Sequence, residues 1–180
     1  MQLQNASKMK LFGSFGMKVF DVRSGRPELI FRWVRKNQVT NQGRTALLEL
    51  MCPFGITDAS INNQIWSFEV GTNNTPPSID DDETTMTAVF TSNLSFSSGE
   101  CVIVATSPNS YYLAISKSVG TGDANGSTLT EAGIYTRGDD PDPLLATGRR
   151  LYARQVHSPI IKTGTMTIVY DWQLGILIQS

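Results

Sequence analysis

The sequence predicts a mostly β protein, an antiparallel sandwich of two sheets with one short helix, and a barrel is the alternative arrangement of the same strands. Two observations support this fold class. Roughly eight to ten short runs alternate apolar and polar residues, as half-buried strands do, and clusters of Gly, Pro, Asn, Asp and Ser separate them. A single stretch near residues 41–52 repeats its apolar residues at helical spacing instead.

The beginning of the chain is expected to form an extended arm over residues 1–15, ahead of one β-rich domain over residues 16–180. This segment is polar at first and then rich in glycine and large apolar residues, without a regular period. Such a segment can become ordered on a neighbouring subunit. Leu11, Phe12 and Phe15 are the residues expected to pack there.

A β-hairpin is expected next, because residues 18–22 and 28–35 both alternate and a turn-forming segment with Gly25 and Pro27 separates them. The helix follows. Thr40 or Asn41 is suited to cap its start, and Pro53 ends it. At about three turns this helix is too short to be stable alone, so it must pack against a sheet.

The rest of the chain predicts further strands. They are expected at residues 65–70, 101–106, 111–116, 128–135 and 151–156, with shorter β-rich pieces at 86–90 and 94–96. The closing strand has the clearest alternation. The residues that share its apolar face are Met166, Ile168, Tyr170, Trp172 and Leu174.

The most specific local feature is the run of turn-forming residues from Val70 to Asp80. Gly71 permits a positive φ, and Pro76 and Pro77 each fix φ near −65°. Asn and Thr side chains can bond their own backbone. We therefore predict a stiff, exposed, uncharged loop that carries contacts between protein subunits. The residues expected at this interface are Thr72, Asn73, Asn74, Thr75, Pro76 and Pro77.

The charges argue against two classes of partner. Fifteen Lys and Arg residues are balanced by 16 Asp and Glu, so nucleic acid is not expected as the main partner, although a local basic patch lies between Arg23 and Lys36. No apolar run is long enough to span a membrane, and the first residues do not resemble a secretory leader. We expect a protein made in the cytoplasm of its host.

No constellation of residues predicts catalysis, so we expect no enzyme activity, no cofactor and no metal site. The single histidine, His157, has no second ligand nearby and is expected to be a polar residue at a strand end. Cys52 and Cys101 lie in apolar stretches and are expected to be buried, reduced thiols. The glycine-rich pieces lack the lysine that a phosphate-binding loop requires.

Two other features suggest a rival function. The acidic run from Asp80 to Glu83 does not alternate as calcium loops do, so we expect its carboxylates to accept hydrogen bonds at the start of a short helix or turn ahead of Met86. Tyr111 and Tyr112 point to opposite faces of one strand, so one ring at most meets a given ligand. A receptor-binding or carbohydrate-binding sandwich, with either tyrosine and the Asp80 to Asp82 loop as its site, is the alternative function.

Several short motifs occur in order between residues 38 and 175. They are Asn41-Gln42-Gly43-Arg44, Phe68-Glu69-Val70-Gly71-Thr72 with Thr75-Pro76-Pro77 and Asp80, Thr130-Glu131-Ala132-Gly133-Ile134-Tyr135, Leu145-Ala146 or Tyr152-Ala153-Arg154, and the Thr-rich closing strand with Trp172. In this order they resemble a group of tailed-bacteriophage virion proteins found among tail, fibre and head-decoration gene products. Asn73-Asn74 stand where that group usually has a glycine.

The resemblance implies a non-enzymatic structural protein of a phage particle, located in the tail, the baseplate or the fibre base, or decorating the head. Its partners would be other copies of itself and other virion proteins. The group contributes no catalytic residues. A surface with few charges suits such assembly, because uncharged groups that bond across an interface leave no ions to desolvate.

Overall fold

The computed structural model describes residues 8–51, 62–82, 84–89, 95–107, 110–138 and 149–179, and all that follows concerns these residues. They form nine strands and one helix, so the predicted mostly β class is confirmed. The elements are β1 (Lys8–Asp21), β2 (Glu28–Lys36), β3 (Gln38–Val39), α1 (Asn41–Met51), β4 (Asn62–Gly71), β5 (Cys101–Ser107), β6 (Ser110–Val119), β7 (Thr128–Gly138), β8 (Leu151–Ile161) and β9 (Met166–Gln179).

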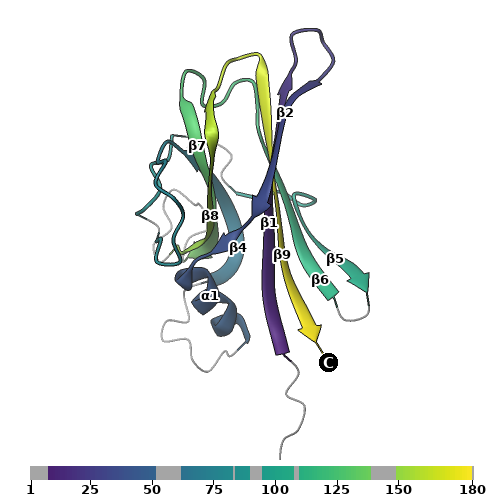
Figure 1. Cartoon of the computed structure of the whole chain (residues 1–180), viewed down its shortest axis with the longest axis vertical. Coiled ribbons are helices and arrows are strands. Elements are labelled where there is room, and N and C mark those ends of the chain that lie inside the picture. Colours follow the sequence, from purple (N-terminus) through teal and green to yellow (C-terminus); the bar gives the residue numbers. More distant parts are fainter. Residues whose placement is uncertain are drawn as a thin grey trace, which may run out of the picture.

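The strands form two sheets that face each other (Figure 1). The five-stranded sheet has the order β2-β1-β9-β6-β5, and the four-stranded sheet has the order β3-β8-β7-β4. Every neighbouring pair is antiparallel. The sheets do not close on each other, so the predicted sandwich is confirmed and the barrel alternative is wrong.

The core lies between the inner faces of the two sheets. The predicted apolar face of the closing strand is confirmed, since Ile168, Tyr170 and Trp172 are buried there. Aromatic rings from both sheets meet at its centre. The ring centroids of Phe68 and Trp172 lie 5.5 Å apart, and those of Phe15 and Trp172 lie 4.8 Å apart. Such edge contacts add to the stability that area burial supplies.

The first strand corrects the prediction of an N-terminal arm. β1 begins at Lys8, opposite Gln179, and its ladder with β9 continues to its last residue. Residues 8–15 therefore belong to the five-stranded sheet, while residues 1–7 lie outside the described part of the chain. The prediction was wrong because the strand that pairs with this segment lies at the far end of the sequence.

The predicted hairpin and helix are confirmed. β1 and β2 are joined by the turn at Gly25, which has a φ of 74°. β2 forms one edge of the five-stranded sheet, and the chain then crosses to the four-stranded sheet through β3 and enters α1. The helix packs against β8 and β4, as a helix of this length requires. No helix among the described residues combines the length and apolar composition needed to cross a bilayer.

Two strand predictions need correction. β8 continues to Ile161, so His157 lies inside the strand and is buried, where the sequence predicted a strand end. Residues 84–89 form no strand, and their only ladder contact is the isolated bridge between Gly71 and Ala88. This segment instead crosses the outer face of the four-stranded sheet, where Met86 packs with Tyr135.

Candidate functional site

The loop that follows β4 turns back over the outer face of the four-stranded sheet. Asn73 fixes this course with three hydrogen bonds. Its backbone N–H donates to Glu131 Oε1 at 2.9 Å, its side-chain Nδ2 donates to the Thr85 carbonyl at 2.7 Å, and its Oδ1 accepts from the Thr75 N–H at 2.9 Å. Asn73 is thus engaged inside its own chain.

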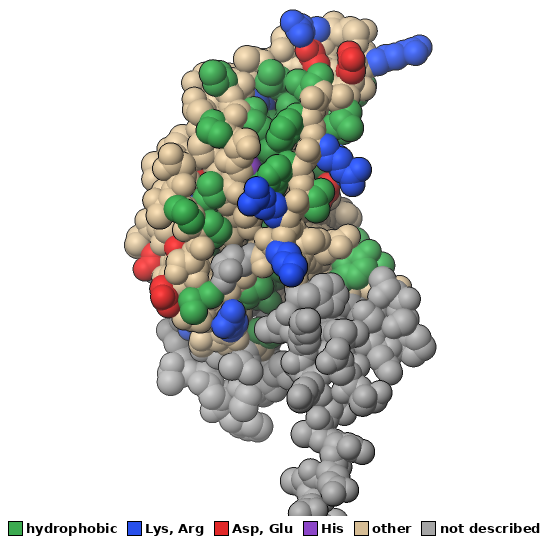
Figure 2. Space-filling view, in the orientation of Figure 1, with side chains coloured by type: hydrophobic (Ala, Val, Ile, Leu, Met, Phe, Trp, Pro, Cys, Tyr) green, Lys and Arg blue, Asp and Glu red, His purple; other side chains and the backbone are tan. Residues whose placement is uncertain are grey.

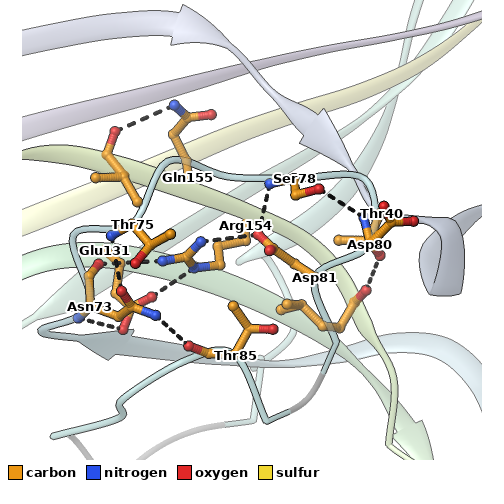
Figure 3. A network of polar contacts seen from close by, with 12 residues as sticks. Thr40, Asn73, Thr75, Ser78, Asp80, Asp81, Thr85, Glu131, Arg154 and Gln155 are labelled. Carbon is orange, nitrogen blue, oxygen red and sulfur yellow. Dashed lines mark hydrogen bonds and ion pairs between the residues drawn. The ribbon is translucent and has the colours of Figure 1, made fainter.

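Arg154 of β8 lies at the centre of the polar contacts under this loop (Figure 3). Its Nε donates to Glu131 Oε2 at 2.7 Å, its Nη1 donates to Asp81 Oδ2 at 3.0 Å, and its Nη2 donates to the Asn73 carbonyl at 3.3 Å. The side chains of Arg154 and Glu131 are both 0% exposed. We call these four residues, Asn73, Asp81, Glu131 and Arg154, the Arg154 cluster.

The Arg154 cluster holds two carboxylates and one guanidinium away from water, which is costly unless hydrogen bonds satisfy the remaining polar atoms. Backbone donors supply these bonds. The Thr87 N–H donates to Glu131 Oε1 at 2.9 Å, and the Ser78 N–H donates to Asp81 Oδ2 at 3.0 Å. Both donors belong to the segment between β4 and β5, so burial of the charges depends on the course of that segment.

The start of α1 is attached to the same region. Thr40 caps the helix, since its Oγ1 accepts from the Gly43 N–H at 3.0 Å, and the same hydroxyl donates to the Leu151 carbonyl of β8. Asn41 ties the helix to the loop: its N–H donates to the Ile79 carbonyl at 2.6 Å, and its side-chain amide donates to Asp80 at 2.9 Å. The predicted cap at Thr40 is confirmed.

Two glycines of the motifs are required by close packing. A Cβ on Gly71 would lie 2.6 Å from the Thr87 carbonyl oxygen and closer still to the Glu131 carboxylate. A Cβ on Gly43 would overlap the backbone carbonyl of Tyr152. Gly71 does not have the positive φ that the sequence suggested. Its role is to let the loop approach the sheet, which a turn-based argument does not reveal.

A second ion pair lies on the same face of the four-stranded sheet. Arg149 Nη2 donates to Glu69 Oε1 at 2.7 Å, and the guanidinium carbon lies 4.2 Å from the centroid of the Tyr135 ring. Burial raises the pKa of the Tyr135 hydroxyl, so this residue stays neutral and acts as a packing surface for Arg149.

Four of the motifs quoted above lie at or beside the Arg154 cluster, whereas the closing strand with Trp172 belongs to the other sheet. The cluster residues come from the loop after β4, from β7 and from β8, which are far apart in the sequence, and Asn41 at the start of α1 bonds to Asp80 beside the cluster. No family model, curated protein or solved structure matches this chain. The resemblance to phage proteins is therefore an expectation from the motifs alone, and the roles of the motif residues in this chain rest on the contacts just described.

The predicted interface residues of the loop divide into two groups. Asn74, Thr75 and Pro76 are exposed at its tip, while Thr72 and Pro77 are half-buried. The tip contains no charged side chain. The hydrogen bonds of the Arg154 cluster attach the residues next to the tip to the sheet, so the tip is an uncharged surface whose position is fixed.

The other predicted interface residues lie in β1. Phe15 is fully buried in the core, where its ring centroid lies 5.7 Å from that of Trp33, so it cannot contact a neighbouring subunit. The prediction for Phe15 is therefore wrong. The backbone of Leu11 and Phe12 lies in the ladder with β9, and their side chains lie outside the described part of the structure.

The single histidine packs between the two sheets. His157 Nδ1 lies 2.9 Å from the Ser158 carbonyl, which can only accept, so this nitrogen carries the proton. The Tyr170 hydroxyl, 3.3 Å from Nε2, then donates to it. Burial lowers the pKa of His157 and favours this neutral form. Cys101 is a half-buried free thiol whose pKa is raised by desolvation, while Cys52 lies outside the described residues.

The structure does not bring the residues of the alternative site together. Asp81 is committed to Arg154, and Asp82 accepts hydrogen bonds from the N–H and hydroxyl groups of Thr84, which lower its pKa. Tyr112 lies on β6 of the other sheet, and the side chain of Tyr111 is outside the described residues. Within the described ranges no three His, Cys, Asp or Glu side chains gather at a spacing suited to a metal ion.

The ion pairs of the Arg154 cluster were not predicted. The available signal was a single charge inside each of two otherwise uncharged strand segments, Glu131 among Thr, Ala and Gly residues and Arg154 after Leu151-Tyr152-Ala153. A charged residue in a buried strand requires a partner. The two residues are therefore candidates for pairing, but the sequence does not show that Asp81 completes the set.

Proposed function

We propose that this chain is a non-enzymatic structural protein of a bacteriophage particle, which assembles with copies of itself and with other virion proteins. Its place is the tail, the baseplate, the fibre base or the head surface, and it reaches the particle after synthesis in the host cytoplasm. The observation that carries the proposal is that four of the motifs that resemble phage virion proteins, all except the closing strand, lie at or beside the Arg154 cluster, a buried and mutually paired set of charges.

The contacts of the Arg154 cluster favour a role in fixing the loop above it and not a role in catalysis. Glu131 accepts from Arg154 and from two backbone N–H groups and is 0% exposed, so a substrate cannot reach its carboxylate. Arg154 is fully buried, so it cannot reach an anionic ligand at the surface. A catalytic acid, base or cation needs access to a substrate, and the paired charges here instead fix the loop that lies above them.

A fixed loop is useful in a symmetric assembly. Each copy presents the same surface, and contacts between copies form at lower cost when little chain entropy is lost on binding. The uncharged tip from Asn74 to Pro76 is exposed and can hydrogen-bond across an interface without desolvating ions. We therefore assign Thr72, Asn73 and Pro77 to support of the tip and the exposed residues to contact.

Two measurements test the proposal. The purified chain is expected to sediment as an oligomer, and mass spectrometry of purified particles of the phage that encodes it is expected to detect it in a fixed ratio to other virion proteins. Asn74→Ala probes the contact assigned to the loop tip, and this variant should fold as the wild type does, since Asn74 is exposed. A monomer at all concentrations, together with absence from the particles, would falsify the proposal.

A further inference from the structure

Exposed apolar side chains gather at the two edges of the five-stranded sheet. Among the described residues, eight large hydrophobic side chains are exposed, and six of them lie on the edge strands β2 and β5. Those on β2 are Leu29, Ile30, Phe31 and Val34, and those on β5 are Val102 and Ile103. Ile103, at 79% exposure, is the most exposed of the eight. Exposed apolar groups concentrated in this way indicate an interaction surface.

Both edge strands also have an open backbone edge in the part of the chain that the structure describes. β2 pairs with β1 alone, and β5 pairs with β6 alone. An open edge presents a row of unpaired N–H and C=O groups that can bind another strand. The two edges therefore combine backbone groups and apolar side chains, which are the two requirements for pairing with a further strand.

The charges on the two edges differ. β2 carries Arg32, Arg35 and Lys36 against one acidic residue, Glu28, whereas β5 contains no charged residue. Figure 2 shows Lys and Arg side chains beside apolar ones along the strand labelled β2 in Figure 1. Pairing β2 with a second β2 would place these cations near their own copies, and Arg32 already lies opposite Lys18 in the ladder with β1. Like charges placed across a ladder are destabilising.

We propose that β2 of one copy pairs with β5 of the next copy, so that the five-stranded sheet continues from subunit to subunit. The inference rests on the proposed self-assembly and adds a second contact surface to that of the loop tip. On the outer face Val34 and Val102 would lie at the joint, and on the inner face Phe31 and Ile103 would. In this pairing the exposed apolar side chains of β2 contact those of β5, and the cationic strand β2 lies beside the uncharged strand β5.

The strand directions determine the type of joint. Each of the four neighbouring pairs in the order β2-β1-β9-β6-β5 is antiparallel, so β2 and β5 run in the same direction. If one rotation relates each copy to the next, β2 of one copy and β5 of the next therefore form a parallel strand pair, and the copies join head to tail. Such a heterologous contact makes a ring if the rotation closes and a filament if it does not.

Cross-linking tests which edges meet. Two chains are made in a background with Cys52→Ser and Cys101→Ser, one carrying Val34→Cys and the other Val102→Cys, with different affinity tags. A short bismaleimide is expected to join the two chains when they are mixed and to join neither chain to itself. Cross-linking of the Val34→Cys chain to itself would show β2 against β2 and overturn the proposal.

Sedimentation provides a second test that does not depend on cysteine. Ile103→Arg adds a cation to the edge expected to meet β2 and should raise the dissociation constant of the oligomer by about tenfold or more. Ile103→Glu should keep the oligomer, because its carboxylate would lie on the same face of the joined sheet as Arg35. The matched control is Ile161→Arg on β8, which is 66% exposed and lies on neither edge of the five-stranded sheet. This control should behave as the wild type.

The outcomes separate the inference from the proposed function. If the wild type is an oligomer and Ile103→Arg leaves it intact, the edge pairing is wrong and self-assembly by another surface stands. If the wild type is a monomer at every concentration tested, both the edge pairing and the self-assembly are wrong. Circular dichroism of each variant confirms that the fold is unchanged, as expected for a side chain as exposed as Ile103.

Discussion

The two sheets of this protein are covered very differently. The outer face of the four-stranded sheet carries Arg154 and Glu131 at 0% exposure, because the segment after β4 lies over them. The outer face of the five-stranded sheet has no such cover among the described residues. Its ion pair, Lys18 with Asp171, is 2.7 Å long, and the two side chains are 39% and 31% exposed.

The difference shows that an ion pair has a different effect when it is buried than when it is exposed to solvent. A buried ion pair needs every remaining polar atom bonded, so it fixes the backbone that supplies those bonds. An exposed pair is hydrated and contributes little to stability. The four-stranded sheet therefore holds the loop after β4 in place through the Arg154 cluster. The five-stranded sheet leaves its edge strands β2 and β5 open to other chains.

The largest expected effect is at Arg154. Arg154→Met removes the cation and leaves the carboxylates of Glu131 and Asp81 buried without it, so we expect a loss of about 3–5 kcal/mol in the free energy of unfolding. Urea denaturation measures it as a lower midpoint with an unchanged slope. Adding Glu131→Gln to this variant should restore part of the loss. A loss as small as that of an exposed pair would show that the cluster does not support the sheet.

A smaller effect is expected from the motif glycine under the loop. Gly71→Ala places a Cβ against the Thr87 carbonyl and the Glu131 carboxylate, and such overpacking costs about 1–3 kcal/mol. The matched control is Gly16→Ala on the bare sheet, where the nearest atoms would lie 3.8 Å from the new Cβ. That change should stay within about 0.5 kcal/mol of the wild type. Equal losses at both sites would contradict the difference between the two faces.

The free energy of unfolding should depend on pH through His157, which is buried between the two sheets. Burial holds the pKa of His157 below its ordinary value of 6.5, so the unfolded chain takes up this proton at a higher pH than the native chain does. Stability is therefore complete above that value and falls as the pH decreases through it. Thermal unfolding from about pH 7 to about pH 5 should show a steeper loss for the wild type than for His157→Gln. Identical slopes would mean that folding does not lower the pKa of His157.

The smallest effect is expected at the exposed pair. Lys18→Met removes the partner of Asp171 on the bare sheet, and the loss in unfolding free energy should be below about 1 kcal/mol and should shrink further at high salt. The same denaturation measurement checks it beside Arg154→Met. If Lys18→Met and Arg154→Met lowered the free energy of unfolding by similar amounts, the buried and the exposed ion pairs would not differ in their contribution to stability.

Elements defined by local patterns were predicted well. The closing strand alternates strictly, and its inward residues, including Tyr170 and Trp172, are those of the core. The helix has its cap at Thr40 because a hydroxyl before a helical repeat satisfies a backbone N–H nearby in sequence. Both features depend on residues within a few positions of one another, which a sequence displays directly.

Features defined by distant partners were predicted poorly. The sequence predicts an arm at Phe15 because its segment has no period of its own, yet Phe15 lies opposite Trp172 in the longest ladder among the described strands. Arg154 and Asp81 are 73 positions apart, and no local rule pairs them. The role of Gly71 also depends on a distant residue, since Glu131 reaches the loop from β7.

The amino-acid order alone specified where strands and the helix form, because alternation, helical spacing and turn residues act through sterics and burial over a few neighbouring positions. The packed structure decided which strand lies beside which, which charges leave water, and which edges stay open. Those outcomes depend on chain segments far apart in sequence that meet only after folding, when the low dielectric between them makes an unpaired charge costly and a matched one specific.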